Sequence, residues 1–437
     1  SIPKPLHKIA GRPMIDYVAS SALSIEPTLA AVVLSHDLYA NDDVLTHLQI
    51  LFGNRLALAI QPEPLGTGSA LQAAIPLVTD ADTVVVLFAD HPLLTGEVLQ
   101  ELVATPPTTD APVTLLTCPM NDAAGYGRIA RDEHRNVLRI VERKDDDPSL
   151  RLGLTEVNSG MMAIHGPWLQ ENIGNLTASS TTGELYLTQL VEIATNSGKI
   201  VNTVTGSAAT LVGVNDRAEL ATAEQAILNA IVADHQRNGV SFVRPESSVI
   251  ERSVTIGQDT VILPGCILRG ATHIASHCVI GPNTVLTDST IEDHCVVQAS
   301  WITESSIGSH SDVGPYSHVR GGSVVGPAVH IGNFAELKNA RLSDEVRVGH
   351  FSYLGDVSIG TRTNIGAGVV TCNYDGVDKH ETTIGAAVFV GSDTMLVAPV
   401  ELGDRSATGA GSVVTKDVRP GETVVGVPAK PFGPRRE

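Results

Sequence analysis

The sequence has few cysteines, few aromatic residues and no long apolar run. Its five cysteines form no C-x-x-C pair and leave one without a partner, which favours reduced thiols and a cytoplasmic location. No apolar segment reaches the length that spans a membrane. The formal net charge of -19 argues against nucleic acid or an acidic membrane as a partner, because both require a basic face. A small anionic ligand stays compatible, since a few local Lys and Arg residues suffice to bind a phosphate.

The chain of 437 residues is too long for one ordinary hydrophobic core, so two domains are expected. In the first half, apolar runs of strand length alternate with helical patterns, which predicts a Rossmann-like α/β domain with a mostly parallel sheet. The expected strands are residues 29–35, 55–61, 83–90 and 112–118, and the expected helices are residues 13–23, 68–78, 183–196 and 218–239. The last helix is taken as a linker, which places the domains at 1–217 and 241–437 with the linker at 218–240.

Beyond about residue 244 the sequence repeats every six positions. Aliphatic residues recur at Ile256, Ile262, Leu268, Ile274 and Ile280, usually with a small residue four positions later. Six residues form one short strand and a turn, and three such units form one triangular coil. The repeat therefore predicts an all-β, left-handed parallel β-helix in which each coil buries its apolar side chains only against neighbouring coils.

Cysteines and histidines within the repeat have simple interpretations. The cysteines that occupy the small corner position are expected to be packing residues rather than metal ligands: Cys266, Cys278 and Cys295. Six histidines with no polar cluster nearby in sequence are expected to be exposed turn residues: His273, His277, His294, His310, His318 and His330.

One polar segment, TCNYDGVDKHETTIG at residues 371–385, interrupts the repeat. Aliphatic residues spaced by six precede it up to Leu337 and resume after it at Ile384. The wall of a β-helix is smooth and cannot by itself enclose a small ligand. The interruption is therefore expected to form a loop that projects from the wall and supplies polar groups to a binding site.

Short motifs occur in a characteristic order along essentially the whole chain. In the first half they are PKPLHKIAGRPMIDYV, LGTGSALQAA, FADHPLL, GYGRI, IVERKD, EVNSG, GELYLT and GVNDR, and in the second VGHFSYLGD, NIGAGVVTCNYDG and VGSDTMLVAPV. Together they resemble the bacterial family of bifunctional N-acetylglucosamine-1-phosphate uridylyltransferases and glucosamine-1-phosphate N-acetyltransferases. The resemblance implies a nucleotidyltransferase domain followed by a β-helix acetyltransferase domain.

The family resemblance also implies the ligands and the assembly. The co-substrates would be UTP, acetyl-CoA and sugar phosphates, with Mg²⁺ as cofactor. The product, UDP-N-acetylglucosamine, would supply the synthesis of peptidoglycan and lipopolysaccharide precursors. Proteins with a β-helix of this class commonly assemble as homotrimers, with sites formed between neighbouring copies.

Phosphoryl transfer needs cations around the phosphates, and three residues of the first half fit that need. Lys4 offers a fixed positive charge, although a lysine near a chain end is otherwise a solvated surface group. Asp90 ends an expected strand, where α/β sheets bind ligands, and its carboxylate suits Mg²⁺; the alternative is a plain turn residue. By resemblance, Asn215 is its partner at the metal.

The resemblance implies two further groups of residues in the first half. The uracil-reading group is Gln61, Gly66 and Thr67, and the sugar-binding group is Gly127, Glu142 and Asn158. Phe88 departs from the family, which often has Tyr there, so a hydroxyl contact is expected to be missing.

The family also has a strand and a glycine-rich turn with an arginine just before the PK pair, whereas the printed sequence begins at Ser1. Such a turn binds the triphosphate through backbone amides. We expect the printed sequence to be a fragment; the alternative is a first domain with impaired uridyl transfer.

Acetyl transfer to an amine needs a base, cations for the phosphate and a donor for the oxyanion. His350 is predicted to be the base, because imidazole accepts a proton near neutral pH. The resemblance implies that glucosamine-1-phosphate is bound by Arg320, Lys338, Tyr353 and Asn364. It also implies that Asn373 orients His350 and that Tyr374 contacts the sugar phosphate. Ser392 would contact the oxyanion or the thioester, and Ala410 would line the channel for the pantetheine arm.

Three alternatives stay open at this point. The chain could be an acetyltransferase only, or a sugar-1-phosphate nucleotidyltransferase whose β-helix is regulatory. A non-enzymatic scaffold subunit would also account for the absent turn, but it leaves the polar residues around His350 and the NYDG segment unexplained.

Overall fold

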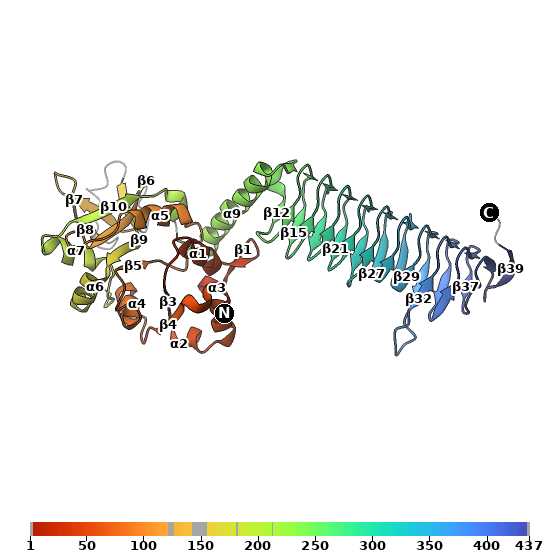
Figure 1. The fold of residues 1–437 in the computed structure, drawn as a ribbon, viewed down its shortest axis with the longest axis horizontal. Helices are drawn as coiled ribbons and strands as arrows, with labels where there is room; N and C mark the ends of the chain where they lie inside the picture. Colours follow the sequence, from red (N-terminus) through yellow and green to blue (C-terminus); the bar gives the residue numbers. More distant parts are fainter. Residues whose placement is uncertain (1–2, 121–125, 142–154, 181, 212, 435–437) are drawn as a thin grey trace. The chain divides into compact units, whose positions relative to one another are not determined.

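The structure is a computed structural model that describes residues 3–120, 126–141, 155–180, 182–211 and 213–434 (Figure 1). The chain divides into two compact units, Ser1–Glu224 and Gln225–Glu437, and the division lies inside helix α9 (Arg217–Arg237). Each unit is described on its own. Across the described residues, every helix is too short or too polar to cross a lipid bilayer.

The N-terminal unit combines strands and helices in the order that the sequence predicts for an α/β domain. Its longer strands are β3 (Ala30–Leu34), β4 (Leu56–Ile60), β5 (Thr83–Val86), β6 (Val113–Met120), β7 (Arg128–Arg131), β8 (Val137–Val141), β9 (Thr155–His165) and β10 (Val201–Thr205). Its main helices are α1 (Met14–Leu23), α3 (Asp42–Phe52), α4 (Thr67–Ala74), α5 (Gly96–Ala104), α6 (Gly166–Asn172) and α7 (Gln189–Asn196). The predicted α/β fold class of this unit is confirmed.

Parallel pairs in this unit are β3 with β4 and β10 with β6. Strand β9 lies among them as an antiparallel partner of β5, β6 and β7. The sequence analysis did not identify β9, because its polar first half, TEVNSG, hides the apolar run that follows. Gly160 within β9 has a φ of +86°, and a Cβ there would lie 2.6 Å from the ring of Phe88, so only glycine fits.

Two predicted elements of this unit differ in length from the prediction. The strand expected over 83–90 ends at Val86, so Asp90 lies in a turn beyond it. The helix expected over 183–196 begins only at Gln189. Residues 183–188 form a loop instead, because the backbone of Leu185 bonds with Leu65 and Gly68, at 2.7 and 2.8 Å. That loop supports the segment before α4.

The C-terminal unit is the predicted parallel β-helix, which confirms the interpretation of the six-residue repeat. One wall contains strand pairs such as β26 (His330–Ile331) with β28 (Arg347–Val348) and β30 (Asn364–Ile365) with β33 (Phe389–Val390). Consecutive coils place these paired, buried residues on top of one another: Ile262, Ile280, Val297, Val313, Ile331, Val348, Ile365 and Val390. Each is at most 2% exposed, so every coil is stabilised by its neighbours.

The corner positions of the coils hold small residues, and some of these form hydrogen bonds with backbone N–H and C=O groups. Cys266, Cys278 and Cys295 are buried free thiols, as expected for packing residues. On the same row, Thr260 Oγ1 donates to Ala275 O at 2.8 Å and accepts from Cys278 N at 3.0 Å. The corners are too small for a large apolar side chain, and short polar side chains fit there and bond to the backbone.

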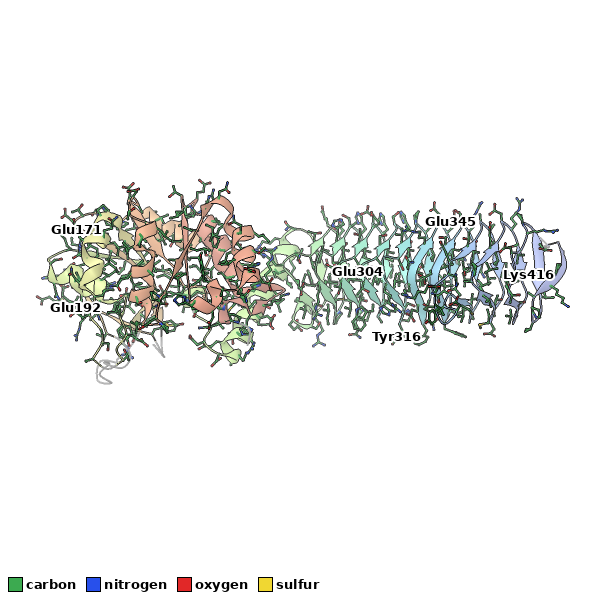
Figure 2. All side chains as sticks on the ribbon, turned by 90° about the horizontal axis from the view of Figure 1, so that it is seen from below. Glu171, Glu192, Glu304, Tyr316, Glu345 and Lys416 are labelled. Carbon is green, nitrogen blue, oxygen red and sulfur yellow. The ribbon has the colours of Figure 1, made fainter. Side chains whose placement is uncertain are left out.

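Outward-facing side chains such as Glu304, Tyr316 and Glu345 cover the surface of the β-helix (Figure 2). Three of the histidines expected in turns do lie in turns: His277, His294 and His310. The rings of neighbouring members of this set stack 4.7–4.9 Å apart. The same prediction is wrong for three others, which lie in strands: His273, His318 and His330. Each of the latter precedes a buried aliphatic residue, so the strand begins at the histidine and its side chain faces outward.

Burial of the aliphatic rows is expected to dominate the stability of the β-helix. Ile331→Ala removes a fully buried side chain and should lower the free energy of unfolding by about 2–5 kcal/mol. Val324→Ala, at an exposed position (42%), is the matched control and should change it by about 0.5 kcal/mol or less. Urea denaturation followed by circular dichroism measures both; equal effects would contradict the assignment of the interior.

Candidate active sites

Three predicted residues of the N-terminal unit meet around one ammonium group. Lys4 lies in a short 3₁₀ helix, Asp90 in the turn after β5, and Asn215 just before α9. Lys4 Nζ donates to Asp90 Oδ2 at 2.6 Å and to Asn215 Oδ1 at 3.2 Å. Val214 N also donates to Asp90 O at 2.9 Å, which ties the two oxygen-bearing segments together. Positions 86 and 211 residues distant from Lys4 thus form one cluster.

The carboxyl group of Asp90 is held ionised. Burial opposes its ionisation, but hydrogen bonds from His91 and Lys4 and the charges of both outweigh it and lower the pKa of Asp90 to about 2. His91 Nδ1 lies 2.9 Å from Asp90 Oδ1, so each carboxylate oxygen has its own partner. The sequence analysis missed His91, and its only signal was its place directly after Asp90.

The oxygens of Asp90 and Asn215 fit a divalent cation. Both accept from a single ammonium group, so they converge on one point where positive charge is stable. Mg²⁺ is usually bound by one or two carboxylates together with substrate phosphates, and a carboxylate plus an amide oxygen matches that donor set. In the described part of the chain, no group of three or more His, Cys, Asp or Glu residues could hold a metal by itself.

The residues predicted to recognise uracil form a turn that is held by hydrogen bonds. Gln61 Nε2 donates to Gly66 O at 3.1 Å, and Thr67 Oγ1 accepts from Leu187 N at 3.1 Å. Gly66 has a φ of +99°, and a Cβ there would come 2.8 Å from Leu185 O, so no side chain fits. The loop at residues 183–188 therefore fixes the turn before α4. The backbone of this turn packs directly against the backbone of the loop.

Two of the three predicted sugar-binding residues are neighbours. Asn158 N donates to Gly127 O at 2.8 Å, and Asn158 is 6% exposed. Its Oδ1 is buried and has no hydrogen-bond partner within the described structure, which leaves an acceptor free for a ligand donor. Glu142 lies outside the described residues. Phe88 packs on Gly160 and presents no hydroxyl, as expected from its departure from the family.

In the C-terminal unit, predicted residues share one wall of the β-helix. Arg320 in β24 (His318–Arg320) pairs in register with Lys338 in β27 (Ala335–Leu342), and Lys338 with Gly355 in β29 (Ser352–Ile359). Arg320 Nη2 and Nε donate to Glu336 Oε1 at 2.5 and 3.0 Å. The hydroxyl of Tyr353 lies against Gly355, where a Cβ would collide with it. The wall therefore presents two cations and a phenol on successive coils.

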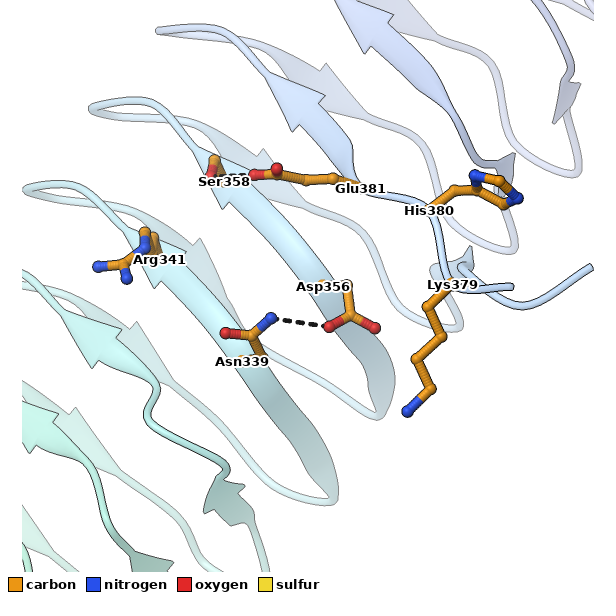
Figure 3. A pocket seen from close by; sticks show the side chains of 7 residues that line it. All are labelled: Asn339, Arg341, Asp356, Ser358, Lys379, His380 and Glu381. Carbon is orange, nitrogen blue, oxygen red and sulfur yellow. Dashed lines mark hydrogen bonds between the residues drawn. The ribbon is translucent and has the colours of Figure 1, made fainter. Parts of the chain in front are cut away.

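The inserted loop adds a third cation, Lys379, which the sequence analysis did not assign. The positively charged ammonium group of nearby Lys338 lowers the pKa of Lys379. A polar cavity of about 380 Å³ opens at the base of the loop (Figure 3), lined by Asn339, Arg341, Asp356, Ser358, Lys379, His380 and Glu381. The only sequence signal for Lys379 was its position inside the interrupting segment.

The loop spans residues 373–381, between β31 (Val370–Cys372) and β32 (Thr382–Ile384), and projects from the stack (Figure 1). Asp375 closes it: Oδ2 lies 2.7 Å from His380 Nε2, and Oδ1 accepts from the backbone of Val377 and Asp378, both at 2.8 Å. These bonds, that from His380 first, lower the pKa of Asp375 well below its ordinary value. Tyr374 forms an antiparallel bridge with Lys379, so the loop is a small ordered hairpin.

Asn373 joins the loop to the wall. Its Nδ2 donates to Asp356 Oδ2 at 2.5 Å, and Asp356 Oδ1 accepts from Asn339 at 2.8 Å. Burial opposes ionisation of Asp356, but these two bonds and the charges of Lys338 and Lys379 lower its pKa. Among the described residues, none bonds to the imidazole of His350, so orientation of His350 by Asn373 stays a prediction.

His350, Ser392 and Ala410 lie along one edge of the β-helix. Each is two positions after a paired wall residue, in the series Val348, Ile365, Val390 and Thr408. His350 is exposed, and its turn leads directly into β29, which carries Tyr353. Asn364 lies in β30 on the adjacent wall, on the other side of this edge. The arrangement places a proton acceptor on an edge beside the cationic wall.

Comparison with known proteins gives the same two-part organisation. A family model described as nucleotidyl transferase matches residues 1–207, and one described as the GMPPB C-terminal domain matches residues 245–333. A solved CMP:2-keto-3-deoxy-manno-octonic acid synthetase in complex with CTP aligns with 52% of this chain and 92% of its own, at 20% identity and a TM-score of 0.39. That likeness is too weak to carry an argument.

Proteins named bifunctional protein GlmU are similar over nearly the full length. Those of Mycobacterium bovis (strain BCG / Pasteur 1173P2) and Corynebacterium diphtheriae are each 40% identical, over 99% and 97% of this chain and 87% of their own. That of Exiguobacterium sp. is 39% identical over 95% of this chain and 91% of its own. With this identity over nearly the whole of both sequences, the chain belongs to the GlmU family of bifunctional proteins.

Proposed function

We propose that the chain is a bifunctional transferase that makes UDP-N-acetylglucosamine in two steps. The C-terminal unit transfers acetyl from acetyl-CoA to glucosamine-1-phosphate. The N-terminal unit transfers uridyl from UTP to N-acetylglucosamine-1-phosphate and releases pyrophosphate. Membership of the GlmU family supports both activities. Because UTP and acetyl-CoA are cytoplasmic metabolites, we place the reactions in the cytoplasm.

One observation carries the acetyl-transfer half of the proposal. Arg320, which pairs with Glu336, and the lysines Lys338 and Lys379 place three cationic side chains on the wall and loop, next to the edge that bears His350. Three cations fit the dianionic 1-phosphate of the acceptor. A β-helix that serves only regulation or assembly has no need for this grouping in a chain of net charge -19.

The chemistry of acetyl transfer follows from these side chains. The amine of the sugar binds as an ammonium, and His350 takes a proton from it so that its lone pair is free to attack. The nitrogen attacks the thioester carbonyl, and the hydroxyl of Ser392 donates to the resulting oxyanion. Collapse of the intermediate forms the amide and releases coenzyme A as the thiolate, and the second proton lost from the attacking nitrogen neutralises that thiolate. Tyr353, Asn364 and Tyr374 contact the sugar phosphate, and Ala410 leaves room for the pantetheine arm.

For uridyl transfer, an oxygen of the sugar 1-phosphate attacks the α-phosphorus of UTP, and pyrophosphate leaves from the opposite side. Gln61, Gly66 and Thr67 hold the base, and Gly127, Glu142 and Asn158 hold the sugar. Asp90 and Asn215 would bind Mg²⁺ together with phosphate oxygens. When bound, Mg²⁺ supplies charge neutralisation on the transferring phosphates, while Lys4 contributes a second fixed positive charge.

We also propose that the chain functions as a homotrimer through an exposed aromatic edge. Tyr316, Phe334 and Phe351 occupy equivalent positions on three successive coils and are 64%, 59% and 55% exposed. The rings of Tyr316 and Phe334 stack at 5.4 Å. A continuous row of exposed aromatic side chains is typical of an interaction surface. Phe351 directly follows His350, so a copy bound here would lie beside the proposed base.

The base assignment is tested by His350→Ala. We expect the kcat of acetyl transfer to fall about 10²–10⁴-fold, because the proposed general base is lost. Release of free coenzyme A thiol from acetyl-CoA in the presence of glucosamine-1-phosphate measures the rate. His330→Ala, at another exposed histidine of the β-helix, is the control and should leave kcat unchanged. Retained activity in His350→Ala would refute the mechanism.

The cationic wall is tested by Lys338→Met and Lys379→Met. Loss of one charge-assisted contact of about 1.5–3 kcal/mol should raise the KM for glucosamine-1-phosphate roughly 10–100-fold. The KM for acetyl-CoA should change far less. Lys416→Met, an exposed lysine elsewhere on the β-helix (Figure 2), should change neither constant. An unchanged KM in both wall variants would remove these lysines from the sugar-phosphate site.

The aromatic edge is tested by Phe334→Arg. A charge in the middle of the row should dissociate the assembly, which sedimentation velocity detects as a fall from the mass of three chains to that of one. Glu345→Arg, at another exposed position of the β-helix, is the control and should keep the trimer. A trimer that survives Phe334→Arg would place the interface elsewhere.

A further inference from the structure

His91 is a buried histidine next to the proposed metal ligand, and the proposed function gives it no role. Its side chain is 9% exposed. The ring packs against Phe88, with centroids 5.7 Å apart, and against Gly213, where a Cβ would lie only 2.9 Å from Cε1. Gly213 is held in turn, because its N–H donates to Tyr126 Oη at 3.0 Å. The imidazole is therefore held in place by its contacts with Phe88 and Gly213.

The hydrogen bond between His91 and Asp90 has a defined direction. A carboxylate of ordinary pKa is ionised at neutral pH and only accepts hydrogen bonds, so the proton between Nδ1 of His91 and Oδ1 of Asp90 belongs to the imidazole. The other ring nitrogen, Nε2, is buried and has no partner in the described structure. An unpaired buried polar atom is costly, and an apolar side chain of similar size would avoid that cost. The bond to Asp90 is what an apolar residue could not provide.

The bond to Oδ1 leaves Oδ2 to face the point where the Lys4 ammonium group lies and where a divalent cation would bind. Oδ2 lies 2.6 Å from Lys4 Nζ, and Asn215 Oδ1 lies 3.2 Å from the same atom. Asn215 is fixed independently, because its backbone N–H donates to Glu219 Oε2 at 2.5 Å. Without His91, the carboxylate of Asp90 could rotate about χ2 and turn its oxygens away from Asn215.

We propose that His91 is a positioning residue, which donates from Nδ1 to Asp90 and holds Oδ2 toward Asn215 Oδ1 to preform a divalent-cation site. Partners that orient a metal-binding carboxylate in this way commonly affect metal affinity as strongly as a weak ligand does. The inference rests on the proposed uridyl transfer in the N-terminal unit, since it assigns the role of a residue at that same site.

The test compares two amides that differ only in reach. His91→Asn places an N–H donor where Nδ1 lies, whereas His91→Gln places it where Nε2 lies and cannot bond to Asp90. His91→Leu removes the donor altogether. Mn²⁺ is the probe: its dissociation constant in the presence of UTP is measured from the electron paramagnetic resonance signal of free Mn²⁺. We expect Gln and Leu to weaken Mn²⁺ binding about 10–100-fold, and Asn to stay within about threefold of the unaltered chain.

Two controls separate this inference from the proposed function. Asp90→Asn should weaken Mn²⁺ binding at least as much as His91→Leu. If Asp90→Asn binds Mn²⁺ like the unaltered chain, the metal site itself is wrong and the proposed uridyl-transfer site fails with it. If Asp90→Asn weakens binding but His91→Leu does not, or if Asn and Gln behave alike, only the role of His91 is overturned. Acetyl transfer by the C-terminal unit shows that each variant chain is folded there.

A measurement on the unaltered chain covers the case in which the His91 variants do not fold. Nitrogen NMR of the imidazole distinguishes a protonated ring nitrogen from a bare one. We expect Nδ1 of His91 to carry a proton, with the Nδ1 signal shifting on addition of Mg²⁺ and UTP. A bare Nδ1 would overturn the proposal, because it could not donate to Asp90.

Discussion

In-register pairing of each coil with the next is the constraint on which the C-terminal unit depends. Ile280, for example, pairs with Ile262 on the coil before it and with Val297 on the coil after it, and all three are fully buried. A coil has no core of its own, so a shift in register would expose an entire row of aliphatic side chains. The same register fixes what faces outward. Arg320 and Lys338 share a wall for this reason, and His350, Ser392 and Ala410 share an edge.

The candidate site of the N-terminal unit is built differently, from turns that are far apart in sequence. Nothing in a repeat brings Lys4, Asp90 and Asn215 together; opposite charge and a backbone bond between the segments do so. Such a site is sensitive to small rotations of each side chain, because no periodic framework corrects them. The geometry of the site then depends on local contacts, such as the hydrogen bond between His91 and Asp90 and the packing of Leu185 against Gly66.

The sequence predicted the β-helix well because a period of six is visible in single residues such as Ile256 and Ile262. Residue type and motif led to the roles proposed for Asp90 and His350, and those roles stay predictions. The sequence did not predict β9, whose polar start TEVNSG masks an antiparallel strand, nor the loop at 183–188, whose fold is set by backbone contact with Leu65. Lys379 was missed because its weight comes from lying beside Lys338, 41 positions earlier, a proximity that only the folded hairpin creates.

Ile365 and Val390 pair in register like the other neighbours in their row, although 25 residues separate them and the remaining steps of that row are 16 to 18. The extra residues leave the wall and return to it without disturbing the stack. Closing a longer excursion costs free energy that grows only with the logarithm of its length. The hairpin at 373–381 is thus a module that selection or an engineer could lengthen, shorten or replace. Acceptor preference is in this way free to diverge while the scaffold beneath it is conserved.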